Sequence, residues 1–131
     1  MDPLKILPAD LPEAVRQTRR ESRWDTILPL NLITGSGEII PAVVLNLSAS
    51  GLLALVDVRF SPLLPPPRGS RFEAEFFLDE LAIHQAVLEI LRIEKRSDHL
   101  IALGCQFVHV PPEVSVALRA KITARLHTSH R

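Results

Sequence analysis

Short apolar segments, interrupted by polar residues and turns, follow one another along the chain after the first 25 residues. Segment 26–34 has an alternating character, and turns containing glycine, serine or aspartate separate several of the six segments: 26–34, 38–47, 51–60, 71–79, 81–95 and 99–110. A period of two residues is typical of strands that bury one face. The sequence therefore predicts six antiparallel strands joined by short connections.

The apolar pattern changes to a helical period after Pro111 and Pro112. The apolar residues that follow recur at steps of four positions: Val114, Leu118, Ile122 and Leu126. This spacing places them on one side of an amphipathic helix, with basic residues mostly elsewhere on its surface. A small β-barrel would bury the stripe, so we predict an all-β barrel with one C-terminal helix.

Prolines mark the irregular parts of the chain. Pro41 lies inside the second predicted strand and implies an edge position or a β-bulge, because proline cannot donate to the ladder. Segment 61–70 is rich in proline and is predicted to be a loop. The first residues are polar and contain prolines, and a capping-box pattern there favours a short helix over about 11–18. The predicted organisation is a leader over 1–25, a barrel over 26–110, and a helix with its tail over 111–131.

The composition is that of an ordinary globular domain and argues against a nucleic-acid-binding surface. Of 131 residues, 47% are hydrophobic and 23% are charged, and 15 basic residues balance 15 acidic ones. Binding of DNA or RNA normally needs a basic face. One Trp, five Phe and no Tyr provide no evident aromatic platform for single-stranded bases. We therefore expect no DNA or RNA partner.

The remaining reactive residue types suggest neither a metal site nor catalysis. Cys105 is the only cysteine, and its apolar surroundings favour a small buried hydrophobe over a reactive thiol. The five histidines show no metal-ligand spacing with cysteines or carboxylates. The start of the chain lacks a signal-peptide pattern, and no window approaches the ~20 apolar residues of a membrane span. We expect a cytoplasmic protein that is not an enzyme and does not insert into a membrane.

Two short segments carry the most plausible binding chemistry. RRESR (19–23) precedes the first predicted strand, and NLSASG (46–51) ends the second. An arginine can face the O6 and N7 acceptors of guanine, stack on a base or pair with a phosphate. Taken alone, RRESR better suits a solvated charge run, and NLSASG better suits an ordinary turn. Their joint occurrence at strand boundaries is what indicates a ligand site.

Together the segments read R-x-x-x-R followed by N-x-S-x-x-G, with one strand, a hairpin turn and a second strand between them. This order resembles the signature of the PilZ domain, a bacterial receptor for the second messenger cyclic di-GMP. The resemblance extends from about Gln17 to the C-terminal helix, and LGCQF (103–107) is similar to the family's late G-x-x-F strand. It implies a six-stranded antiparallel PilZ-type β-barrel.

The resemblance also implies roles for individual residues. Arg19 and Arg23 would grip guanine edges and phosphates of cyclic di-GMP. Asn46 and Ser48 would contact the other side of the guanines, and Gly51 would shape the turn. Asparagine at the first position of the second motif is a common variant of the family's aspartate.

Three further residues have less sharply defined roles. Arg20 suits a phosphate contact or a solvated position. Arg92 falls where some relatives place a residue that stacks on a base, although taken by itself it better suits an exposed arginine on a strand face. Trp24 suits an anchor between leader and barrel better than a cover over the ligand.

The resemblance implies a non-enzymatic receptor that changes conformation on binding cyclic di-GMP and regulates an effector protein. Motility, exopolysaccharide synthesis and virulence are the family's outputs, and both a monomer and a homodimer are compatible with the sequence. No cofactor other than this ligand is expected. One alternative is a PilZ-fold adaptor without nucleotide binding, as in pilus assembly, against which the intact motifs argue. The other is a small oligonucleotide-binding barrel, which neutral charge and scarce aromatic residues disfavour.

Overall fold

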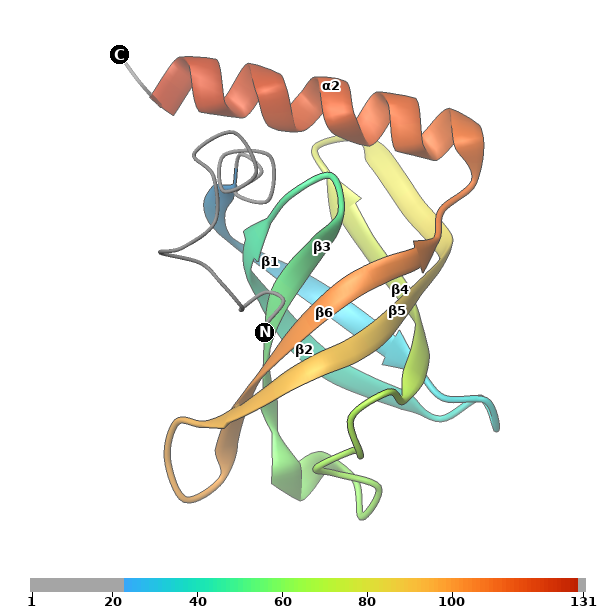
Figure 1. Ribbon diagram of the computed structural model, residues 1–131, viewed down its shortest axis with the longest axis vertical. Helices are drawn as coiled ribbons and strands as arrows, with labels where there is room; N and C mark the ends of the chain where they lie inside the picture. Colours follow the sequence, from blue (N-terminus) through green and yellow to red (C-terminus); the bar gives the residue numbers. More distant parts are fainter. Residues whose placement is uncertain (1–22, 130–131) are drawn as a thin grey trace, which may run out of the picture.

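The computed structural model describes residues 23–129, which form a closed antiparallel barrel followed by one helix (Figure 1). The six strands are β1 (Trp24–Ile33), β2 (Ile39–Leu47), β3 (Gly51–Asp57), β4 (Arg71–Leu78), β5 (Leu81–Lys95) and β6 (Leu100–His109). Their order around the ring is β1-β2-β3-β6-β5-β4. The predicted six-stranded barrel with a C-terminal helix is confirmed.

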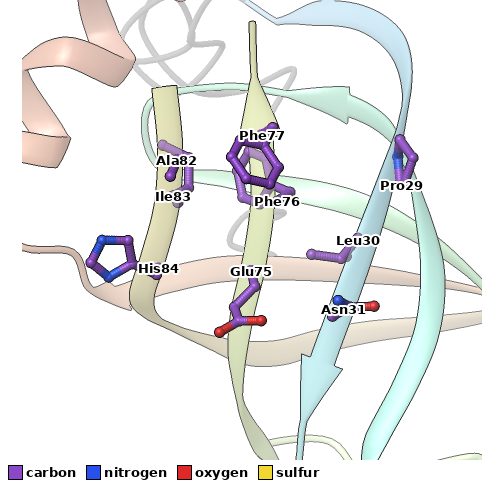
Figure 2. A pocket seen from close by; sticks show the side chains of 9 residues that line it. All are labelled: Pro29, Leu30, Asn31, Glu75, Phe76, Phe77, Ala82, Ile83 and His84. Atoms are coloured by element: carbon purple, nitrogen blue, oxygen red, sulfur yellow. The ribbon is translucent and has the colours of Figure 1, made fainter. Parts of the chain in front are cut away.

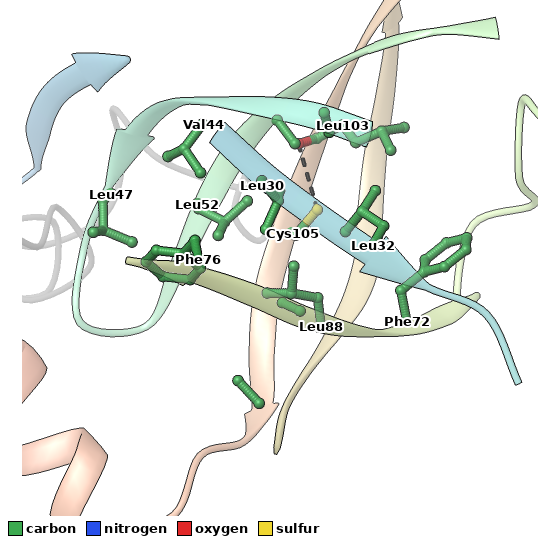
Figure 3. Close-up of a cluster of buried hydrophobic side chains, with 14 of the residues drawn as sticks. Leu30, Leu32, Val44, Leu47, Leu52, Phe72, Phe76, Leu88, Leu103 and Cys105 are labelled. Atoms are coloured by element: carbon green, nitrogen blue, oxygen red, sulfur yellow. Dashed lines mark hydrogen bonds between the residues drawn. The ribbon is translucent and has the colours of Figure 1, made fainter. Parts of the chain in front are cut away.

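Successive side chains along each strand point alternately into the barrel and out of it. On β1, the side chains of Leu30 and Leu32 point inward and are 2% and 0% exposed. Their neighbours Pro29 and Asn31 point outward and are exposed. The inward side chains of all strands meet in one apolar core (Figure 3). Cys105 belongs to this core, and its burial raises the pKa of the thiol to about 12, as expected of a buried hydrophobe.

The third strand is shorter than its apolar pattern predicts. It ends at Asp57, and a 3₁₀ turn, η1 (Val58–Phe60), follows where the sequence predicted more strand. The Asp57 carboxylate accepts a hydrogen bond from the backbone N–H of Arg59 at 2.9 Å and pairs with its guanidinium at 2.7 Å. These local contacts compete with the ladder and turn the chain away from it.

Pro41 is tolerated because only one of its sides faces a paired strand. It lies opposite Asn31 of β1, whereas pairing of β2 with β3 begins at Ala42. Of the edge position or β-bulge that the sequence predicted here, the structure shows an edge-like position, because Pro41 is unpaired on its β3 side. The predicted loop over 61–70 also lies between strands, because β4 begins at Arg71. The leader and its predicted helix over 11–18 lie outside the described residues.

The barrel closes through a short seam between β1 and β4. The residues that pair there are Asn31 with Glu75, Leu32 with Ala74, and Ile33 with Glu73. Towards the start of β1 the two strands separate, and there β1 keeps its pairing with β2 while β4 keeps its pairing with β5. One end of the barrel is consequently left open along this seam.

Helix α2 (Pro112–Ser129) lies across that end of the barrel (Figure 1). The predicted stripe faces the core: Val114, Leu118 and Ile122 are buried, and Leu126 packs partly against them. Because burial of an apolar stripe stabilises a helix more than intrinsic propensity does, the barrel end is what holds α2 in place.

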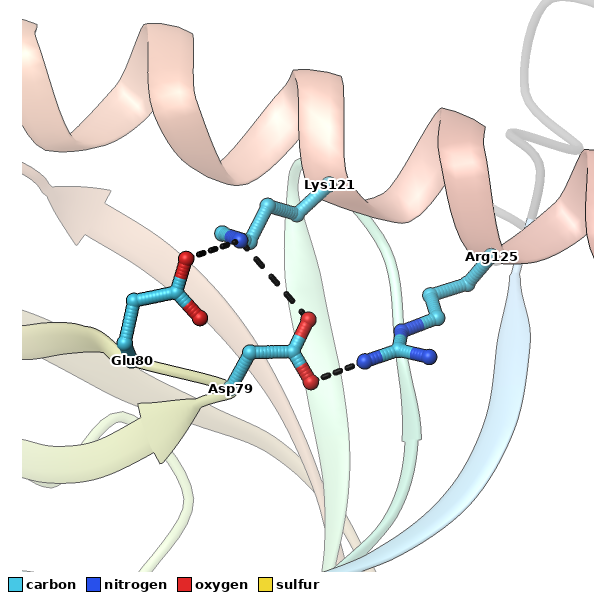
Figure 4. Close-up of polar contacts among 4 residues, drawn as sticks. All are labelled: Asp79, Glu80, Lys121 and Arg125. Carbon is cyan, nitrogen blue, oxygen red and sulfur yellow. Dashed lines mark hydrogen bonds and ion pairs between the residues drawn. The ribbon is translucent and has the colours of Figure 1, made fainter.

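Ion pairs fix the second half of α2 to the β4–β5 turn (Figure 4). The Lys121 ammonium lies 3.7 Å from Asp79 and 3.4 Å from Glu80, and Arg125 also pairs with Asp79. Asp79 has a left-handed backbone with φ of 57°, a conformation that aspartate tolerates in tight turns. The Arg125 guanidinium lies 5.5 Å from the centre of the Trp24 ring, so the helix also contacts the start of β1.

Within residues 23–129, no helix has the length and apolar character needed to cross a membrane.

Replacing Leu118 with alanine should destabilise the fold strongly. The side chain is 1% exposed, and removing such a buried leucine costs about 2–5 kcal/mol in the free energy of unfolding. Val116 lies on the same helix and is 72% exposed, so Val116→Ala should change the free energy by no more than about 0.5 kcal/mol. Urea denaturation of both variants measures the difference. Equal effects would contradict the packing of α2 on the barrel.

Candidate ligand-binding face

The N-x-S-x-x-G segment forms the tight connection between β2 and β3. The Ser48 backbone N–H donates to the Gly51 carbonyl at 2.9 Å, and the Ser48 hydroxyl donates to the same oxygen at 3.3 Å. Ser48 is only 6% exposed. Its hydroxyl oxygen also lies 3.4 Å from that of Ser50. The first structural task of Ser48 is therefore to hold this turn in one conformation.

Gly51 is required by a close approach between β3 and β6. A Cβ atom at this position would lie 2.1 Å from the Cys105 carbonyl oxygen and 3.0 Å from the Gln106 Cα. The Phe107 backbone N–H donates to the Ser50 carbonyl at 2.7 Å, which draws the turn onto β6. Gly51 thus shapes the turn by letting two backbones approach, and not by adopting a left-handed conformation.

Asn46 belongs to a row of residues that runs across five strands on the outside of the barrel. Paired Cα positions link each member to the next: Asp25 of β1, Asn46 of β2, Leu53 of β3, Gly104 of β6 and Arg92 of β5. Paired residues of an antiparallel sheet project to the same face. We refer to these five residues as the transverse row.

Arg92 lies across β6 at one end of the transverse row. A Cβ atom on Gly104 would come within 2.9 Å of the Arg92 Nε and 3.3 Å of its Cζ. The guanidinium therefore rests directly on the Gly104 backbone, in the space that any other residue's side chain would fill. β6 lies between β5 and β3. Because the Arg92 side chain reaches from β5 onto β6, its positive charge lies closer to Leu53 and to the turn between β2 and β3, which we call the motif turn.

Arg23 lies at the other end of the row, immediately before β1, and is exposed. It precedes Asp25 by two positions, so continuation of the strand alternation places it on the same face. The side chains of Arg23, Asn46 and Arg92 make no hydrogen bond or ion pair with any other residue of 23–129. Two guanidinium groups and one amide thus remain available to a ligand on this face.

Arg19 and Arg20 lie outside the described residues. The structure brings Asn46, Ser48, Gly51 and Arg92 onto one side of the barrel, with Arg23 at its margin. A planar guanidinium can stack on a base or bind a phosphate in a bidentate manner, and an asparagine amide can both donate and accept. Such a face has the chemistry to bind a nucleotide.

Sequence reasoning missed three members of the transverse row, which are Asp25, Leu53 and Gly104. Leu53 lies opposite Asn46, and a tight turn over Ser48–Ser50 would have indicated this pairing. Gly104 belongs to the LGCQF segment, but nothing in the sequence indicated that Arg92 lies on it, because the two residues come from different strands.

No group of histidine, cysteine or acidic side chains that could hold a metal ion is present among residues 23–129.

The two glycines of this face should respond differently to alanine. Gly51→Ala places a methyl group against backbone atoms of β6 that cannot move alone, and we expect a loss of about 1–3 kcal/mol in the free energy of unfolding. Gly104→Ala meets only the flexible Arg92 side chain, so stability should change by less than about 1 kcal/mol while Arg92 is displaced. Urea denaturation measures the first difference, and the NMR shift of the Arg92 Nε–H measures the second. A fully stable Gly51→Ala variant would contradict the close approach of β3 and β6.

Comparison with solved structures shows that the fold is shared with proteins of low sequence identity. The inhibitor of motility MotI/DgrA of Bacillus subtilis aligns with a TM-score of 0.68 and 16% identity over 84% of this chain and 51% of that chain. The PilZ domain of Escherichia coli YcgR, solved with c-di-GMP, aligns with a TM-score of 0.67 and 17% identity over 85% of this chain and 93% of that one. A longer E. coli YcgR structure in complex with c-di-GMP gives a TM-score of 0.68 and 18% identity over 86% of this chain and 47% of that one.

The chain spans about half the length of MotI and of the longer YcgR structure. No curated protein matched its sequence. The family model described as "PilZ domain" matches residues 17–124, which include both motifs, all six strands and most of α2. The chain therefore belongs to the PilZ domain family.

Proposed function

We propose that this chain is a cytoplasmic receptor for cyclic di-GMP that acts on an effector protein and has no catalytic role. The observation that carries the proposal is the transverse row, because it aligns Asn46 and Arg92 with the motif turn and leaves their side chains available. The PilZ domain of YcgR, which has the same fold, was solved with c-di-GMP.

The chemistry of the ligand suits this face. Cyclic di-GMP offers guanine edges with two acceptors, flat base surfaces and two phosphates. Arg23 and the preceding Arg19 would supply forked donors to guanine edges and phosphates, and Asn46 would contact the opposite side of a guanine. Arg92, whose guanidinium lies against Gly104, presents a planar cation on which a base can stack.

The turn between β2 and β3 and the arginines before β1 would make different contributions to binding. Ser48 and Gly51 hold one half of the site rigid, since they are tied to each other and to β6. Arg20 would add a phosphate contact beside Arg19 and Arg23. A ligand that bridges both motifs would set the position of the residues before Trp24 relative to the barrel, and an effector protein would recognise that arrangement.

Loss of either Arg23 or Arg92, the arginines at the two ends of this face, should weaken binding. A hydrogen bond to a charged group contributes about 1.5–3 kcal/mol, so we expect Arg23→Ala and Arg92→Ala each to raise the Kd roughly 10- to 100-fold. Arg119→Ala, an exposed arginine of α2, is the matched control and should bind like the wild type. Isothermal titration of cyclic di-GMP into the three variants measures these values.

Two outcomes of this titration would overturn the proposal. No heat with the wild type would favour an adaptor that works through protein contacts alone. Equal affinity of the wild type and both variants would mean that the ligand binds elsewhere. The same titration gives the stoichiometry and so distinguishes one bound ligand from two.

A further inference from the structure

A recess lies where β1 and β4 separate, away from the turn between β2 and β3. It is an open pocket of about 400 Å³, and its outward-facing lining comes from three strands: Pro29, Asn31, Glu75, Phe77, Ala82 and His84 (Figure 2). The pocket exists because β1–β4 pairing stops at Asn31 and Glu75, so no ladder fills the space beyond them.

A strained β-bulge forms one wall of the pocket. Ala74 pairs with Ala86 and Phe76 pairs with Ile83, so Glu75 lies opposite two residues of β5, His84 and Gln85. Gln85 adopts a left-handed backbone with φ of 61°, which is uncommon for a non-glycine residue inside a strand. Bulges re-aim side chains and are frequent beside functional sites. Figure 2 shows Glu75 on the middle strand, β4, with His84 of β5 on one side of it and Asn31 of β1 on the other.

The lining combines exposed apolar surface with an uncompensated negative charge. Phe77 is 66% exposed, and Ile27, the outward residue before Pro29 on β1, is 76% exposed. The Glu75 carboxylate has no ion pair or side-chain hydrogen bond with another residue of 23–129, and the same holds for Glu73 on the same face of β4. The pocket lining contains no lysine or arginine.

These features define the chemistry of a matching group. A cation with an apolar stem would pair with Glu75, lie against the Phe77 ring and cover apolar surface with its methylene groups. A guanidinium suits this arrangement best, because it is planar, stacks on aromatic rings and can bind a carboxylate with two hydrogen bonds. Exposed apolar residues around a charged pocket are also typical of surfaces that bind protein partners.

We propose that this pocket binds an arginine side chain from an apolar segment of a partner protein. The pocket is centred on β4, which is three strands away from β3 in either direction around the ring. It shares no residue with the transverse row. A partner could therefore occupy it while the opposite side of the barrel carries a ligand, and the proposal does not depend on nucleotide binding.

An NMR titration of the full ¹⁵N-labelled chain tests this proposal. The probe is a synthetic peptide, Gly-Ser-Leu-Val-Arg-Val-Leu-Ser-Gly, and its control carries citrulline, the neutral isostere of arginine. The arginine peptide should shift the amide signals of Asn31, Phe77 and His84 with saturation at millimolar concentration or below. The citrulline peptide should bind at least tenfold more weakly, because it cannot pair with Glu75.

Variants of the protein locate the interaction. Glu75→Gln and Phe77→Ala should each weaken binding of the arginine peptide about tenfold, and both sites are accessible enough for the fold to persist, which a thermal melt verifies. Glu38→Gln makes the same chemical change in the β1–β2 turn and should bind like the wild type.

Three results would overturn the proposal: no shift with the arginine peptide at millimolar concentration, equal binding of the citrulline peptide, or shifts confined to other strands. A fourth is that the same amides shift when the protein alone is concentrated. That result would make this face an interface between copies of the chain.

Discussion

The short seam between β1 and β4 is the constraint on which the other features depend. Closing the ring removes exposed strand edges and gives every strand two neighbours. At its centre, Leu32 and Ala74 are a large and a small side chain paired at 0% exposure, so the two strands approach without a void. Because only three residue pairs form this seam, the strands separate beyond it. That separation leaves an end for α2 to cover and a pocket on the outside.

Two glycines, which have no side chain, shape the face of the barrel that carries the transverse row. Gly51 and Gly104 both lie where β6 meets a neighbouring strand, yet they are needed for different reasons. Gly51 lets two backbones approach, whereas Gly104 leaves room for a guanidinium. A bulky residue at the first position would separate the strands, and one at the second would only turn Arg92 away. The first glycine therefore serves stability and the second serves the presentation of a charge.

The sequence predicted what depends on local pattern. Short apolar segments bounded by turns indicated all six strands, and the spacing of Leu118 and Ile122 indicated the face that α2 buries. The end of β3 was missed because the contacts between Asp57 and Arg59 override the apolar run that continues beyond it. Neither the position of Arg92 on Gly104 nor the pocket could be predicted. Both depend on the register between separate strands and on a bulge with no glycine or proline to mark it.

Two strands contribute to both faces of the barrel, and this sharing determines how the faces can communicate. β1 carries Asp25 at one end and Asn31 at the other, and β5 carries Arg92 and His84 in the same way. Bulges interrupt both strands between these positions, where a uniform ladder would otherwise tie the two ends together. A ligand on the transverse row that favoured one arrangement of these interrupted segments would thereby influence the pocket. By thermodynamic reciprocity, a partner in the pocket would then change the affinity for that ligand by the same factor.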